Sequence, residues 1–166
     1  LASEIINQLR SDRVGIIAYA ATAIPQLPIT TDYGAAKMFL QALHTDMLSS
    51  QGTAIDEAIG LANRYFDDEN QTNRVLCIIS DGEDHGTGAV EVAEQADELG
   101  ITIISVGVGT EKGGPIPIKK KGVVDRYKKD QEGEVVITRL QPNTLRDLAD
   151  TTEGLYIDGN DTQQVV

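Results

Sequence analysis

Three carboxylates follow directly on an apolar run in the sequence: Asp81, Glu83 and Asp84 come after residues 75–79. A carboxylate at the end of a buried strand is costly to desolvate unless it is paired or bound to a cation. Mg²⁺ prefers oxygen ligands and uses one or two carboxylates while keeping several waters. Thr53 offers a hydroxyl oxygen at the start of a predicted helix, so Thr53 and Asp81 together would form part of a hard-cation site.

The same residues also have a purely structural interpretation. Thr53 can cap its helix, with Asp56 three residues later completing a variant of the capping box. Residues 81–84 can form an ordinary turn before a helix, in which Gly82 supplies left-handed backbone geometry. His85 fits a solvated loop position better than a ligand position. Spacing alone therefore leaves the metal site and the structural turn both open.

Apolar runs and amphipathic stretches alternate along the chain. The runs predict buried strands at 13–20, 74–80 and 101–109, and apolar residues at helical spacing predict helices at 32–43, 53–66 and 87–99. This order is typical of a Rossmann-like α/β fold, with a mostly parallel sheet and helices on both faces. Residues 21–30 contain two prolines and predict an antiparallel edge strand. Loops at the carboxyl ends of parallel strands form the functional crevice in such folds.

The segment 112–140 interrupts this alternation. It is rich in glycine, proline and lysine, and it predicts a hairpin insertion with a turn at 130–133. Lys119, Lys120 and Lys121 form a positive spot in this segment, which is typical of solvated hairpin residues.

Composition limits the function classes. The chain has 166 residues with a net charge of −12, which fits one domain spanning 1–166 and excludes a general nucleic-acid binder. Cys77 is the only cysteine, so an intrachain disulfide and a thiolate cluster are both excluded, and its apolar neighbours predict a core position. Helical spacing from the first residue predicts that the sequence is a fragment of a longer protein.

Several separated motifs resemble the von Willebrand factor type A (VWA) domain: "QGTAIDEAI", "VLCIISDGEDH" and "GITIISVGVGT". The stretches "SDRVGIIAYA", "PQLPITTDYGAAKMFL" and "GGPIPI" are similar to bacterial aerotolerance membrane proteins of the BatA/BatB type. The resemblance implies a metal-ion-dependent adhesion site (MIDAS), in which Thr53 and Asp81 match two ligand positions. The rim would comprise Ser49, Ser50, Gly52, Gly82, Glu83 and Asp84.

The family's Asp-x-Ser-x-Ser loop and the strand before it have no counterpart in this chain. The resemblance therefore implies an N-terminally truncated domain whose first strand is missing. The intact protein is expected to bind Mg²⁺ or another divalent cation, and this fragment weakly or not at all. The missing strand would lie between the strands at 14–19 and 74–80. We predict that these two strands either close together or pair with another chain, which would give a strand-pairing dimer.

The expected function is a metal-dependent protein-interaction module, not an enzyme, whose partner offers an acidic ligand. The resemblance places it in the bacterial cell envelope, anchored in the membrane by segments outside this soluble fragment. Two alternatives remain. One is a metal-dependent phosphohydrolase or receiver-like domain that uses the acids beginning at Asp81, and the other is a structural module without a metal.

Overall fold

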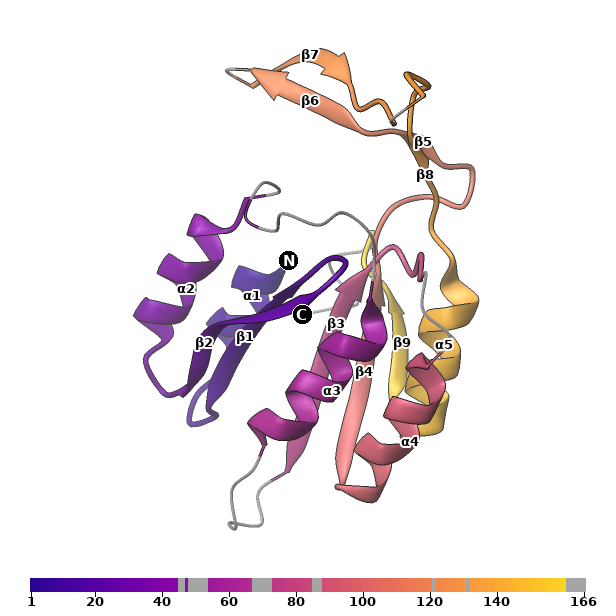
Figure 1. Ribbon diagram of the computed structural model, residues 1–166. Helices are drawn as coiled ribbons and strands as arrows, with labels where there is room; N and C mark the ends of the chain where they lie inside the picture. Colours follow the sequence, from indigo (N-terminus) through magenta and orange to yellow (C-terminus); the bar gives the residue numbers. More distant parts are fainter. Residues whose placement is uncertain are drawn as a thin grey trace.

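Strands and helices alternate along the chain (Figure 1), as predicted for a Rossmann-like α/β fold. The computed structural model describes residues 1–44, 47, 54–66, 73–84, 88–120, 122–130 and 132–160. The elements are α1 (Ala2–Gln8), β1 (Val14–Tyr19), β2 (Ala23–Thr30), α2 (Tyr33–Ala42), α3 (Ile55–Tyr65), β3 (Arg74–Ser80), α4 (Ala89–Glu98), β4 (Ile101–Gly107), β5 (Gly114–Pro115), β6 (Pro117–Lys120), β7 (Val123–Tyr127), β8 (Ile137–Thr138), α5 (Pro142–Thr151) and β9 (Leu155–Asp158).

The central sheet is parallel, with the strand order β3–β4–β9. β3 and β4 pair in register from Arg74 opposite Ile101 to Ser80 opposite Gly107, and β9 joins the other edge of β4. Both crossovers pass through a helix, α4 between β3 and β4 and α5 before β9. The carboxyl ends of these strands therefore meet at one edge, which is where the polar loops were predicted to gather.

β1 and β2 form a separate antiparallel pair, which confirms the predicted antiparallel edge. Within the described residues β1 pairs only with β2, and β3 pairs only with β4. The prediction that β1 and β3 close together is therefore wrong. Among the described residues β1 and β3 each keep an unpaired edge, and pairing of those edges with another chain stays a prediction.

Two hydrophobic clusters hold the helices against the strands. The larger cluster joins α3, α4 and α5 to the central sheet through residues such as Ile59, Ile103 and Leu148, all fully buried. The smaller one joins α1 and α2 to the β1–β2 pair through Ile6, Ile16, Leu27 and Ala36. α3, α4 and α5 therefore pack on the central sheet, whereas α1 and α2 pack only on the β1–β2 pair.

Cys77 is exposed, so its predicted core position is wrong. Its neighbour Val75, two residues away on the same face of β3, is 49% exposed. Ile78, on the opposite face, is buried in the larger cluster. The apolar run at 75–79 predicted burial on both faces, whereas α3, α4 and α5 cover one face of β3 and the described residues leave the other open.

The predicted hairpin insertion is confirmed, and it contains more structure than expected. β5 pairs with β8 near the body, and β6 pairs with β7 further out. Figure 1 shows the β6–β7 hairpin standing out beyond the carboxyl end of the central sheet. The predicted turn at 130–133 is present: the Gly133 N–H donates to the Asp130 carbonyl, and Lys129 bridges to Val135.

Candidate functional site

A crevice of about 600 Å³ lies at the carboxyl ends of β3 and β4. Its walls come from the ends of β1, β3 and β4 and from both strands at the base of the insertion. The lining residues are Tyr19, Ile79, Ser80, Asp81, Val108, Gly109, Thr110, Gly114, Pro115, Ile116, Pro117, Thr138, Arg139 and Leu140. The insertion therefore forms one side of the predicted functional crevice.

Asp81 is held in this crevice by neutral donors. The Thr138 hydroxyl donates to Asp81 Oδ2 over 2.7 Å, and the Glu83 N–H donates to Asp81 Oδ1 over 3.2 Å. The backbone carbonyl of Asp81 accepts from the Gln141 N–H at 2.7 Å. Each carboxylate oxygen has room for a further partner, because a carboxylate offers about four lone-pair sites.

The loop after β3 is tied to the insertion at a second point. Glu83 Oε1 accepts from the Arg139 N–H at 2.9 Å, next to the contact between Thr138 and Asp81. Gly82 has a φ of +74°, and a Cβ at this position would collide with the backbone carbonyl oxygen of Gln141. Glycine is therefore required here both for the left-handed turn and for the close approach of the chain before α5.

Tyr19 brings a buried hydroxyl to the crevice. Its oxygen has no partner that meets hydrogen-bond geometry in the described structure, although the Ser80 side chain is close enough to lower the pKa of Tyr19. Burial raises the pKa of Tyr19 above its ordinary value. Ser80 opposes that increase, and the negative charges of Asp81 and Asp84 add to it. Tyr19 is therefore a neutral group beside the acids and a poor proton acceptor at neutral pH.

The structure brings together part of the predicted site. Asp81, Gly82 and Glu83 lie in one loop, and Asp84 is near enough to Tyr19 to raise its pKa. Thr53, Ser49, Ser50, Gly52 and His85 lie outside the described residues. In the part of the chain that is described, no three His, Cys, Asp or Glu side chains come together as a metal cluster.

Three crevice residues were missed in the sequence: Thr138, Arg139 and Tyr19. Thr138 is 57 positions from Asp81, and no local pattern marks it. Its place at the end of the insertion, where the chain returns to the sheet, is the signal that could have indicated a contact with the crevice.

The possible metal ligands among the described residues are all oxygen atoms, which are the ligands that a hard divalent cation prefers. Asp81 supplies the carboxylate, with the hydroxyls of Ser80 and Thr138 beside it. The Ser80 hydroxyl already accepts from the Gly82 N–H at 3.0 Å. One carboxylate with hydroxyls and water is compatible with Mg²⁺, which retains several waters, but it gives a weaker site than a set of several carboxylates.

Comparison with known proteins places this architecture in a family. The von Willebrand factor type A domain matches residues 1–122. The chain belongs to the von Willebrand factor type A family. The crevice of this VWA domain thus lies at the carboxyl end of the sheet, where the resemblance predicted the adhesion site.

Two solved structures are similar over 99% of the VWA chain. BatB from Bacteroides thetaiotaomicron is 42% identical with a TM-score of 0.90, and 80% of its chain is covered. An aerotolerance-related membrane protein from Bacteroides fragilis is 38% identical with a TM-score of 0.89 and 81% coverage. The kinship with BatB-type proteins is therefore confirmed.

More distant comparisons support the fold and show how much of a longer relative the chain spans. Proximal thread matrix protein 1 from the mussel byssus, with a zinc-occupied MIDAS motif, is 13% identical with a TM-score of 0.69; 99% of the VWA chain and 36% of that chain are covered. A curated relative from Borreliella burgdorferi is 24% identical over 94% of the chain, which spans only 44% of that relative's length. None of the described helices is long and apolar enough to cross a membrane.

Proposed function

We propose that this VWA domain binds a divalent cation, Mg²⁺ in the first place, and through it an acidic side chain of a protein partner. Asp81 is the proposed ligand within the described residues, directly or through water, and Thr53 is the second. The cation would supply a fixed positive charge in the crevice, to which a partner carboxylate can bind.

The observation that carries this proposal is the position of the Asp81 carboxylate. It lies in the crevice at the end of β3, and its described partners are a hydroxyl and a backbone N–H, neither of which neutralises its charge. An unneutralised carboxylate in a partly buried site favours a cation. The mussel byssus protein, which is similar in fold and has a zinc-occupied MIDAS motif, supports a metal in a domain of this kind.

We also propose that the site binds its partner without turnover. The described crevice lining includes no histidine, lysine or cysteine, and Tyr19 is held in its neutral form. General acid–base catalysis needs a group whose pKa is near the working pH. The kinship with BatB and with an aerotolerance-related membrane protein supports a role in a membrane-anchored protein of the bacterial cell envelope connected with aerotolerance.

Calorimetric titration of Mg²⁺ tests the metal proposal. The full-length protein is expected to bind one Mg²⁺ per domain, and the 166-residue chain more weakly. Asp81→Asn should weaken binding by at least about tenfold, whereas Asp97→Asn, on the exposed side of α4, should leave it unchanged. Equal binding by Asp81→Asn and wild type contradicts the proposal.

A substrate screen separates binding from catalysis. Full-length wild type and Asp81→Asn are incubated with p-nitrophenyl phosphate and acetyl phosphate in Mg²⁺. The proposal predicts no turnover by either protein. Hydrolysis or phosphoryl transfer that disappears in Asp81→Asn would favour the phosphohydrolase or receiver-like alternative instead.

A further inference from the structure

The outer hairpin of the insertion concentrates positive charge in an otherwise acidic chain. Of the 14 Lys and Arg residues, six lie in the segment 117–129, together with one of the 26 Asp and Glu residues. The segment therefore carries a charge of +5 and the remainder of the chain −17. Because of this contrast the hairpin has a positive electrostatic potential, which extends over about 10 Å in roughly 0.1 M salt.

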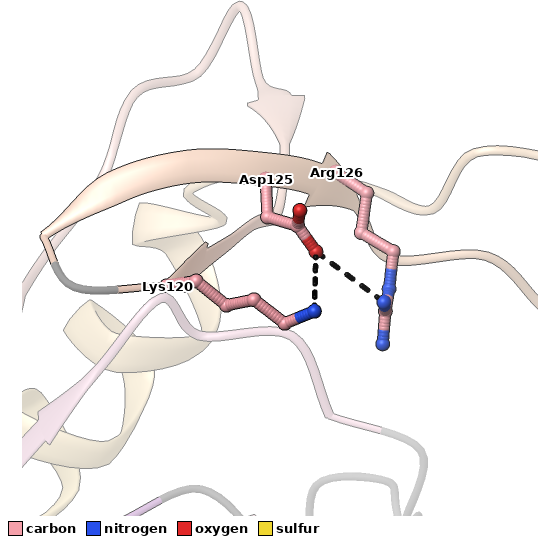
Figure 2. A network of polar contacts seen from close by, with 3 residues as sticks. All are labelled: Lys120, Asp125 and Arg126. Atoms are coloured by element: carbon pink, nitrogen blue, oxygen red, sulfur yellow. Dashed lines mark hydrogen bonds and ion pairs between the residues drawn. The ribbon is translucent and has the colours of Figure 1, made fainter.

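The single acid of the hairpin is already paired. Figure 2 shows Lys120 and Arg126 converging on Asp125, each with a nitrogen 3.4 Å from Asp125 Oδ2. The side chains of Lys120 and Arg126 remain 70% and 64% exposed in these pairs. Exposed ion pairs contribute little to stability, but here they pair the one acid of the segment 117–129; Asp130, Glu132 and Glu134 follow in the next turn of the insertion.

Apolar side chains are interspersed with these cations. Every residue of β7 is exposed, with Val123 at 71% and Tyr127 at 46%. An isolated two-stranded hairpin is only marginally stable in water, because neither face is covered. A partner that covers β7 would therefore bury apolar surface and meet positive charge at the same time.

The base of the hairpin is fixed beside Asp81. Gly114 and Thr138, which pair across β5 and β8, both line the crevice, and Thr138 donates to Asp81. The Arg139 N–H donates to Glu83 one residue later. From Gly114 to the turn at Gly122 the chain can extend about 26 Å, at about 3.3 Å per strand residue. Crevice and hairpin thus form one continuous track.

We infer that this track docks an acidic, carboxylate-rich segment of the protein partner, with one carboxylate directed to the crevice and others lying along the β6–β7 hairpin. The inference rests on the proposed function, since the crevice end of the track is the proposed metal site. Charge favours this class of partner: an acidic segment is repelled by the net negative charge of the remainder of the chain and attracted by the hairpin and by a cation at Asp81.

Fluorescence anisotropy with a labelled peptide of alternating Glu and Ser tests the inference, with alternating Gln and Ser as the neutral control. The full-length protein should bind the acidic peptide, more weakly at high salt, and should not bind the neutral one. The variant Lys120→Gln, Lys128→Gln, Lys129→Gln should bind roughly tenfold more weakly, since each exposed charge pair is worth up to about fivefold. The matched control Arg10→Gln, Lys37→Gln, Arg64→Gln removes the same charge elsewhere and should bind like wild type.

Titrations in Mg²⁺ and in EDTA separate this inference from the proposed function. Binding that needs the hairpin lysines but not Mg²⁺ upholds the hairpin and refutes the metal proposal. Binding that needs Mg²⁺ but not the hairpin lysines upholds the metal proposal and refutes the role of the hairpin. No binding of the acidic peptide, or equal loss in the control variant, overturns the inference. So does hairpin-dependent binding to phosphatidylglycerol vesicles, or hairpin-dependent self-association, when the peptide itself does not bind.

Discussion

Replacing Thr138 by valine should loosen the base of the insertion from the crevice. The substitution keeps the shape of the side chain but removes the hydroxyl that donates to Asp81 Oδ2 over 2.7 Å. A hydrogen bond to a charged group contributes about 1.5–3 kcal/mol, and Thr138 is only half-buried, so the lower end of this range applies. A loss of about 1.5 kcal/mol lowers the Tm of a chain of this size by about 3–6 °C.

Thermal and urea unfolding followed by circular dichroism measure this effect. Thr138→Ser retains the hydroxyl and should recover most of the lost stability. A double-mutant cycle with Asp81→Asn isolates the pair, and a coupling energy of about 1 kcal/mol or more is expected. Thr138→Val with unchanged stability, or a coupling energy of zero, would refute the assignment of this hydrogen bond as the link between the insertion and the β3 loop.

Four further predictions concern the loop, the core, the pH response and the open face of β3. Gly82→Ala should cost at least about 2 kcal/mol, because L-residues disfavour positive φ and the new Cβ meets a backbone carbonyl; the urea midpoint should fall. Thr152→Val should cost about 1–3 kcal/mol, since it removes the buried acceptor 2.8 Å from the Ile103 N–H, and Thr152→Ser should not. Burial raises the pKa of Tyr19, so the hydroxyl loses its proton at a lower pH in the unfolded state than in the folded state. The contribution of Tyr19 to stability should therefore be full below about pH 10 and should be lost as the pH rises through the folded-state pKa. Tyr19→Phe should lessen that loss. Maleimide should label Cys77 in the native chain, because its side chain is exposed even though the surrounding atoms raise the thiol's pKa, and protection at high protein concentration would indicate that another chain covers β3.

The strands and helices of this domain were predictable because their signals are local. The predicted strand at 74–80 coincides with β3, and the predicted edge at 21–30 contains β2. The predicted helix at 32–43 contains α2, which the Asp32 side chain caps by accepting from the Ala35 N–H at 2.9 Å. Each of these features depends on residues within a few positions of one another.

Features that depend on distant parts of the chain were not predictable in the same way. The contact between Thr138 and Asp81 joins residues 57 positions apart. The exposure of Cys77 follows from which helices reach β3, and an apolar run carries no information about that. The β6–β7 hairpin was hidden because an irregular register between Ile118 and Lys119 interrupts the alternation that marks a strand pair.

The most direct test of the metal proposal is the location of paramagnetic broadening when Mn²⁺ is added to the ¹⁵N-labelled protein. Amide signals of Gly82, Glu83 and Arg139 should broaden first, because these residues surround the Asp81 carboxylate. Asp81→Asn should abolish that broadening. Broadening that begins at the exposed acids of α4, or that persists in Asp81→Asn, would contradict the assignment of a cation site at the end of β3.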